Sequence, residues 1–230
     1  GVAAWVGDMG GGGSLVDPAY VAKALADAFE WPQDPVWLER TRSVVTVMRR
    51  RFRDEGGAFS DRPRDDHTVL GMLGEPHRPI TDAPAPSGNA VAAQVLLRLA
   101  ALVNDEALRR EAMAALRAFA GTAQAIPTAV AAYLRAVDWA TSPVVTLVVV
   151  GDDGDPTADA LLHTALTTYR PRTVVRRFEP GKIADDELAP ELRAMIGGAS
   201  PRAYLCVGQT CAAPVSEPEA LVELIRSFGR

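Results

Sequence analysis

GGAFSDRPRDDHTVLGMLGEPHRPITDAPAPSGN, residues Gly56–Asn89, separates two strongly helical parts of this 230-residue chain. The stretch has neither the 3.6-residue period of a helix nor the alternation of a strand. Connections of this length inside a compact domain are usually binding loops or lids, or else disordered. Many of its side chains can exchange protons or bind an oxygen-rich ligand: Asp61, Asp65, Asp66, His67, Glu75, His77, Arg78 and Asp82. We therefore expect a ligand to bind along this loop.

Apolar residues recur at helical spacing on both sides of the loop. The pattern predicts five helices, over residues 15–30, 36–52, 89–103, 106–120 and 127–139. Asp34-Pro35 is a typical helix start, with a capping residue followed by proline in the first turn. Helical hairpins do not bury their apolar faces alone, so residues 15–141 are expected to form one helical region. Residues 1–14 end in GGGGS and are expected to be a flexible lead-in.

From Ser142 onward the pattern changes to strands and helices in alternation. VVTLVVV at Val144–Val150 is a continuous β-branched run, typical of a strand buried on both faces. Further elements are predicted as strands over 173–178 and 203–207, and as helices from 156, over 187–195 and over 217–228. This alternation indicates a small parallel α/β unit over residues 142–230. The fold class of the whole chain is therefore predicted to be α+β.

Composition and motifs argue against nucleic acid, a membrane span and a dinucleotide cofactor. A net charge of −5 with no basic stripe argues against nucleic acid as a partner. No apolar run is long enough for a membrane span. Two cysteines and no signal peptide favour a cytoplasmic location. The GDDGDP segment after Val150 lacks the dinucleotide-binding glycine pattern, and no cofactor is expected.

Asp65, Asp66 and His67 are the candidate catalytic residues. Adjacent carboxyl groups raise one another's pKa, and histidine exchanges protons near neutral pH, so these residue types suit general acid–base chemistry. The alternative is that the aspartates bond turn amides and only order the loop. A metal bound by Asp65, His67 and His77 would need a spacing unlike the standard patterns, so no metal site is expected.

Arg78, Ser87, Gly88 and Asn89 are the candidate ligand-binding residues. The last three begin a helix, where free backbone N–H groups can bind a hydroxyl or phosphate oxygen. A purely structural role is the alternative, with serine or asparagine as the helix cap and glycine allowing a close approach.

Cys206 and Cys211 are the redox candidates. Four residues separate them, unlike the two residues of thioredoxin-type centres. Cys206 lies in a predicted buried strand, where a thiol behaves as a small apolar group. The turn between the two could also bring them together as a disulfide. Two structural thiols without redox cycling are the favoured interpretation.

Four motifs together resemble one family: GGAFSD, DDH, APSGNAVAAQVLLRLAAL and YLCVGQTCAAPVSEP. The chain is similar to the C-terminal region of the thioredoxin-domain-containing, spermatogenesis-associated thioredoxin-like proteins. The resemblance implies that the helical region is part of an (α/α) toroid like those of six-hairpin glycosidases and sugar epimerases, here truncated. It also implies a thioredoxin-like domain elsewhere in such proteins. Ser60–Arg64 departs from the family's usual residues, which leaves the role of Asp61 open.

Two functional hypotheses follow. In the first, the chain is a non-catalytic regulatory or interaction module of a thioredoxin-domain-containing protein. In the second, it binds a sugar-like small molecule, which it isomerises or hydrolyses through the loop over residues 56–89. The expected partners are therefore this small molecule, the parent protein's helical or thioredoxin portion, or a second copy of the chain. Self-association is expected because a truncated toroid would expose large side chains on its helices: Tyr20, Phe29, Trp31, Trp37 and Tyr133.

Overall fold

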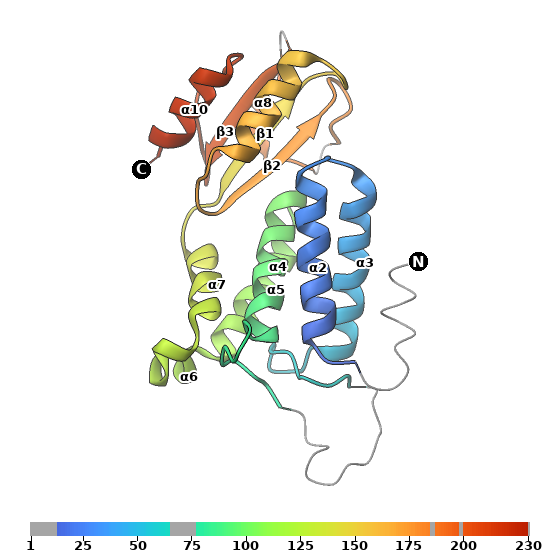
Figure 1. Cartoon of the computed structure of the whole chain (residues 1–230), viewed down its shortest axis with the longest axis vertical. Helices are drawn as coiled ribbons and strands as arrows, with labels where there is room; N and C mark the ends of the chain where they lie inside the picture. Colours follow the sequence, from blue (N-terminus) through green and yellow to red (C-terminus); the bar gives the residue numbers. More distant parts are fainter. Residues whose placement is uncertain (1–12, 65–76, 185–186, 198–199, 230) are drawn as a thin grey trace. The chain divides into compact units, whose positions relative to one another are not determined.

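The computed structural model describes residues 13–64, 77–184, 187–197 and 200–229 (Figure 1). The chain divides into two compact units. The first contains the residues up to 29 together with 34–100 and 106–141, and the second contains 30–33, 101–105 and 142–230. Helices predominate, and a four-stranded sheet lies in the second unit. The predicted α+β class is therefore confirmed, whereas a toroid is not shown.

Two pairs of long helices flank the loop. Before it lie α2 (Val16–Glu30) and α3 (Pro35–Phe52), and after it lie α4 (Gly88–Val103) and α5 (Glu106–Ala118). Asp34 caps α3 as predicted, because its carboxylate accepts a hydrogen bond of 2.9 Å from the Val36 N–H. These four helices begin and end within two residues of the predicted bounds.

The predicted helix over residues 127–139 is wrong as a single element. A short helix, α6 (Ala120–Ala125), is followed by a 3₁₀ turn, η2 (Pro127–Ala129), and then by α7 (Ala131–Thr141). Val130 separates the last two with φ −135° and ψ 39°, outside the helical region. Its side chain is fully buried. Asp82 contacts both sides of the break: its N–H donates to the Ala129 carbonyl, and its carboxylate accepts from the Ala132 N–H.

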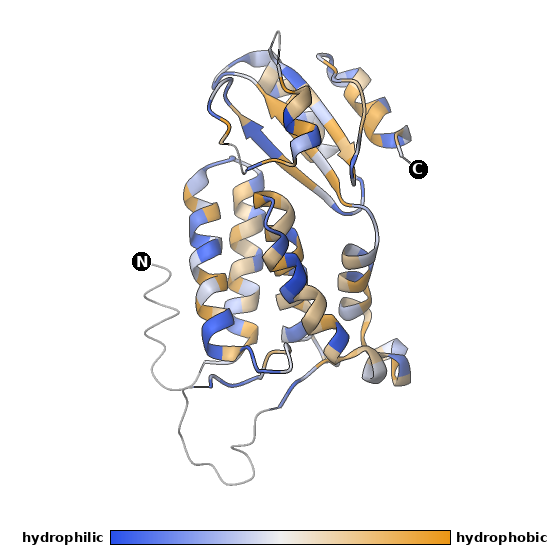
Figure 2. Cartoon of the chain, turned by 180° about the vertical axis from the view of Figure 1, so that it is seen from behind, coloured by the Kyte–Doolittle hydropathy of each residue, from blue (hydrophilic) through white to orange (hydrophobic). Residues whose placement is uncertain are grey.

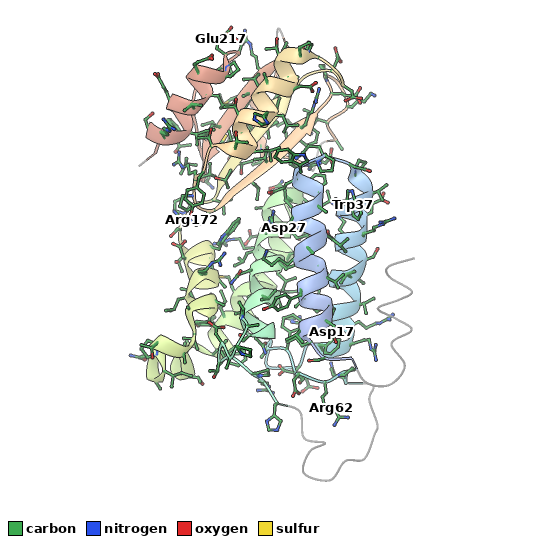
Figure 3. The ribbon with its side chains drawn as sticks, in the orientation of Figure 1. Asp17, Asp27, Trp37, Arg62, Arg172 and Glu217 are labelled. Carbon is green, nitrogen blue, oxygen red and sulfur yellow. A yellow bond between two sulfur atoms is a disulfide. The ribbon has the colours of Figure 1, made fainter. Side chains whose placement is uncertain are left out.

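Helix α4 is apolar on nearly every side and forms the centre of the first unit. All of its residues from Gly88 to Ala100 are buried except Gln94 and Arg98, as expected for a helix inside a core. Arg98 forms an ion pair with Asp27 of α2, which is labelled in Figure 3. Burial alone would raise the pKa of the Asp27 carboxyl, but hydrogen bonds from Arg98 and Lys23 outweigh burial and lower it.

The sheet of the second unit is mixed rather than parallel. Its strands are β1 (Val145–Val150), β2 (Thr173–Phe178), β3 (Arg202–Val207) and β4 (Thr210–Cys211), in the order β2-β1-β3-β4. β1 and β2 are parallel, but β3 runs antiparallel to β1 and begins where β1 ends, with Val150 opposite Arg202.

The connection between β2 and β3 explains this departure from the predicted parallel unit. Within the described part of this connection, the helix is α9 (Pro190–Met195), which has six residues and is about 9 Å long. A six-residue strand is about 20 Å long. The helix therefore does not return the chain along the whole sheet, as a parallel crossover requires.

Both faces of the sheet are covered, as the β-branched run predicts. On one face, Leu147, Val149 and Leu205 pack with α8 (Pro156–Thr167) and α10 (Pro218–Ser227). On the other, Val148 and Tyr204 pack with residues of the connection that includes α9. Figure 2 shows both hydrophobic and hydrophilic stretches along α10, in agreement with a helix that buries one side.

The large aromatic side chains that motivated the predicted self-association differ in exposure. Phe29 and Tyr133 are buried, whereas 63% of Trp31 is exposed and Tyr20 is partly exposed. Self-association stays a prediction. Across the residues that the structure describes, no helix combines the length and the apolar character needed to cross a membrane.

Candidate functional site

Two segments of the long loop are joined by hydrogen bonds between Asp61 and His77. The Asp61 N–H donates to the His77 carbonyl over 2.8 Å, and the His77 N–H donates to Asp61 Oδ1 over 3.0 Å. The Asp61 carbonyl in turn accepts a hydrogen bond from the Leu15 N–H at the start of the helical region. Asp61 therefore has a structural role, which the sequence left open.

Asn89 also joins these two segments of the loop, through Phe59 and Pro79. Its Oδ1 accepts from the Phe59 N–H (2.9 Å), and its Nδ2 donates to the carbonyls of Phe59 (2.8 Å) and Pro79 (3.0 Å). Only 2% of Asn89 is exposed. Its amide thus occupies the place that a neighbouring strand would take beside Phe59.

The other residues of the PSGN motif also have partners inside the protein. Ser87 Oγ accepts from the Ala90 N–H over 3.2 Å, which is a helix-capping contact. A Cβ at Gly88 would lie 3.1 Å from the Leu15 side chain, so glycine permits close packing there. Ligand binding by Ser87, Gly88 and Asn89 stays a prediction, and their observed contacts fix the start of α4.

An open cavity of about 500 Å³ lies near these contacts in the first unit. It is lined by Asp54, Ser60, Arg64, His77 and Arg78. This volume falls within the range of roughly 300–1,000 Å³ that small-molecule sites occupy. Arg78, which the sequence analysis assigned to ligand binding, and His77 both line it. Arg62, labelled in Figure 3, belongs to the same segment of the loop.

The Asp54–Arg78 ion pair is the main electrostatic feature of the cavity. Arg78 Nε lies 2.6 Å from Asp54 Oδ2, and the Asp54 side chain is 14% exposed while that of Arg78 is 53% exposed. Within the described residues, neither carboxylate oxygen of Asp54 accepts a hydrogen bond with suitable geometry. The contact with Arg78 is therefore an ion pair without a well-directed hydrogen bond. The buried carboxylate therefore holds an exposed guanidinium at the cavity wall.

Arg64 supplies a second guanidinium. Its main-chain N–H donates to the Arg51 carbonyl (2.6 Å), and its Nη1 donates to the Arg53 carbonyl (3.3 Å). Arg64 and Arg78 together outweigh the single carboxylate of Asp54, so the charged groups lining the cavity carry net positive charge. Two guanidinium groups can bind a carboxylate or a phosphate through paired N–H donors.

Asp65, Asp66 and His67, the predicted catalytic residues, lie outside the described residues. In the part of the chain that the structure describes, no group of three or more histidine, cysteine or acidic side chains is arranged to hold a metal ion. Sequence reasoning missed Asp54, Ser60 and Arg64. Asp54 had one available signal: it is the first acidic residue after the arginine-rich end of α3, immediately before the loop.

Cys206 and Cys211 are joined by a disulfide, so the favoured interpretation of two separate thiols is wrong. The two residues lie directly opposite each other on β3 and β4, and their Cα atoms are 4.0 Å apart. Gly208 has a φ of +58° in the turn between them, which lets the chain reverse within three residues. The alternative of a disulfide, which the sequence left open, is the one observed.

Comparison with known proteins relates most of this chain to part of a longer protein. No family model matches the chain. It is 28% identical over 218 residues to spermatogenesis-associated protein 20 of Homo sapiens, covering 93% of this chain and 27% of the human protein. The same protein of Rattus norvegicus is 26% identical over equal shares of both chains. An uncharacterized protein of Caenorhabditis elegans is 23% identical, over 92% of this chain and 28% of its own length. The chain therefore spans about a quarter of the length of these curated proteins, and is distantly related to that region of them.

Proposed function

We propose that this chain is a ligand-binding region and that the cavity of its first unit binds a small, hydroxyl-bearing anion, such as a phosphorylated or acidic sugar. The observation that carries the proposal is the exposed Arg78 guanidinium, which the buried Asp54 carboxylate holds at the cavity wall. An arginine fixed in this way has lost part of its conformational freedom before a ligand arrives, which favours binding.

The residues around Arg78 suit a ligand that combines charge with hydroxyl groups. Arg64 adds a second set of N–H donors for an anionic group. The imidazole of His77 and the hydroxyl of Ser60 can exchange hydrogen bonds with sugar hydroxyls. The cavity is open and polar, which favours a hydrated small molecule over an apolar one.

A regulatory role within a longer protein fits the same site. The relatives carry the matching region in about a quarter of their length, so ligand binding here could be communicated to other parts of such a protein. The family resemblance supports an origin of the helical unit in a sugar-processing toroid. The catalytic alternative needs Asp65, Asp66 and His67 beside this cavity, and their substitution is its separate test.

Isothermal titration calorimetry on the whole chain tests the proposal, with glucose 6-phosphate, gluconate, glucose and inorganic phosphate as probes. We expect binding of at least one hydroxyl-bearing anion and much weaker binding of neutral glucose. Arg78→Gln should weaken binding by about 10- to 100-fold, since a hydrogen bond to a charged group is worth about 1.5–3 kcal/mol.

Arg110→Gln is the matched control, because Arg110 is an exposed arginine on α5 that does not line the cavity. It removes the same charge and should leave the dissociation constant unchanged. If Arg110→Gln weakened binding as much as Arg78→Gln, overall charge rather than the cavity would account for it. Absence of binding for all four probes, or equal binding of glucose and its phosphate, would refute the proposal.

A further inference from the structure

The disulfide of the β3–β4 hairpin lies in the second unit and has no part in the function proposed above. We propose that Cys206–Cys211 is a reversible redox site, which a dithiol protein reduces by attack on Cys211. Three features of the hairpin support this: the hairpin is held without the bond, its two sulfur atoms differ in access, and a small cavity lies beside them.

Main-chain hydrogen bonds already hold the hairpin closed. The Ala212 N–H donates to the Leu205 carbonyl over 2.9 Å, and Ala203 and Val215 exchange two hydrogen bonds of 2.8 and 3.0 Å. β3 also pairs with β1 along all six of its residues. The disulfide links positions only five apart, and bonds that close short loops constrain the unfolded chain least. The fold therefore does not depend on this bond.

The two sulfur atoms differ in exposure. Cys206 is 3% exposed and packs with Tyr204 and Leu192. Cys211 is only partly buried, lies on the edge strand β4, and follows three exposed residues, 208–210. An incoming thiolate therefore reaches Cys211 Sγ before Cys206 Sγ, and access decides which sulfur is attacked.

A cavity of about 50 Å³ borders both cysteines. It gives the sulfur atoms room to move apart when the bond between them breaks, without expanding the surrounding core. Glu187 and Glu191 also line it. Glu187 is paired with Arg176, but the carboxylate of Glu191 disfavours the approach of glutathione, which carries net negative charge, and so favours a protein dithiol as the reductant.

The reaction balances as a thiol–disulfide exchange. A donor thiolate attacks Cys211 Sγ, a bond forms between the two sulfur atoms, and Cys206 leaves as a thiolate that takes a proton from solvent. The donor's second thiolate then attacks the donor sulfur of this mixed disulfide and releases Cys211, which is also protonated. The donor becomes a disulfide, and two electrons with two protons pass to Cys206 and Cys211.

Trapping identifies the attacked sulfur. The whole chain in native buffer is mixed with a thioredoxin-type donor whose second active-site cysteine has been replaced by serine, so the mixed disulfide cannot resolve. Fragmentation mass spectrometry should find the donor bonded to Cys211 and Cys206 free for alkylation. A donor bonded to Cys206, or no adduct at all, would overturn the proposal. A Cys206→Ser/Cys211→Ser double variant should show complete loss of the adduct.

Reduction without a protein donor provides the second measurement. Dithiothreitol in native buffer should make both cysteines available to N-ethylmaleimide, with an unchanged far-ultraviolet circular dichroism spectrum, and reoxidation should restore the disulfide. Glutathione at equal thiol concentration should react more slowly. A bond that yields only after denaturation, or a loss of secondary structure on reduction, would show that it is structural.

Discussion

Replacing Asn89 by alanine is expected to destabilise the first unit severely, because Asn89 satisfies two buried main-chain groups, those of Phe59, and one more exposed group, the Pro79 carbonyl. Its amide bonds the N–H and carbonyl of Phe59 and the carbonyl of Pro79 at 2.8–3.0 Å. Phe59 is fully buried. The neighbouring main-chain bonds, from the Asp54 N–H to the Ala58 carbonyl and from the Ser60 N–H to the Phe52 carbonyl, use other groups. Alanine at position 89 would leave those of Phe59 without a partner.

The expected loss in free energy of unfolding is about 3 kcal/mol. Each buried polar group left unsatisfied costs roughly 1–3 kcal/mol, and two such groups, the N–H and carbonyl of Phe59, account for the total, because water can hydrate the Pro79 carbonyl. For a chain of this size, about 3 kcal/mol corresponds to a fall in melting temperature of roughly 6–12 °C. Since a typical domain is stable by only about 5–15 kcal/mol, this one side chain contributes a large part.

Chemical denaturation followed by tryptophan fluorescence measures the loss, and hydrogen exchange at the Phe59 amide localises it. Gln94→Ala is the matched control, because Gln94 is also an amide on α4 but donates a single hydrogen bond, to the Ala132 carbonyl over 2.7 Å. It should lose about 1 kcal/mol. If Asn89→Ala lost no more than Gln94→Ala, or if the Phe59 amide kept its protection, the assigned role of Asn89 would be wrong.

Three further substitutions test other contacts of the first unit. Gly57→Ala should lower the free energy of unfolding by about 1–3 kcal/mol, because Gly57 has a φ of +88° and an added Cβ would lie 3.1 Å from the Ala114 side chain. Thermal denaturation measures this loss, and an unchanged melting temperature would contradict it. Asp27→Asn should make the free energy of unfolding depend less on pH on the acid side. The pKa of Asp27 is lowered in the folded protein, so its contribution to stability is complete above the unfolded pKa near 4 and is lost as pH falls through the folded value. Urea titrations at several pH values measure this, and a variant with the same acid profile as the unchanged protein would refute it. Arg49→Met should lower the free energy of unfolding by about 1–2 kcal/mol, because it breaks the paired contact with Glu111. Urea unfolding measures this loss, which should be smaller in about 1 M salt. A loss that does not depend on salt would argue against an electrostatic origin.

Helix starts were predicted well because capping is local chemistry. Asp34 and Asp155 each precede a proline and accept hydrogen bonds from N–H groups two or three residues later, and sequence alone contains all of that information. The direction of β3 was not predicted, since it depends on how far a connection of irregular structure carries the chain. The break at Val130 likewise involves a residue distant in sequence, Asp82, which forms hydrogen bonds with Ala129 and Ala132.

The candidate site was only partly predictable for the same reason. Arg78 and His77 were recognised as polar residues of a long loop, and both line the cavity. Asp54 was missed because its importance comes from contact with Arg78, which is 24 positions further along the chain. The PSGN motif was recognised, but the partners of Asn89 lie 10 and 30 positions away, and no local spacing indicates them.

The arrangement of the candidate ligand-binding residues therefore depends on the structural residues of the loop. Asn89 and Asp61 hold residues 59–61 beside residues 77–79, and this arrangement places Ser60, Arg64, His77 and Arg78 around one cavity. A substitution at Asn89 should consequently weaken binding less than Arg78→Gln does in a fully folded protein, because Asn89 only positions the cavity residues, whereas Arg78 is proposed to bind the ligand. Titrations of both variants well below their melting temperatures separate the two effects. Equal losses of affinity there would contradict a purely positioning role for Asn89 and would favour direct contact with the ligand, as the sequence first suggested.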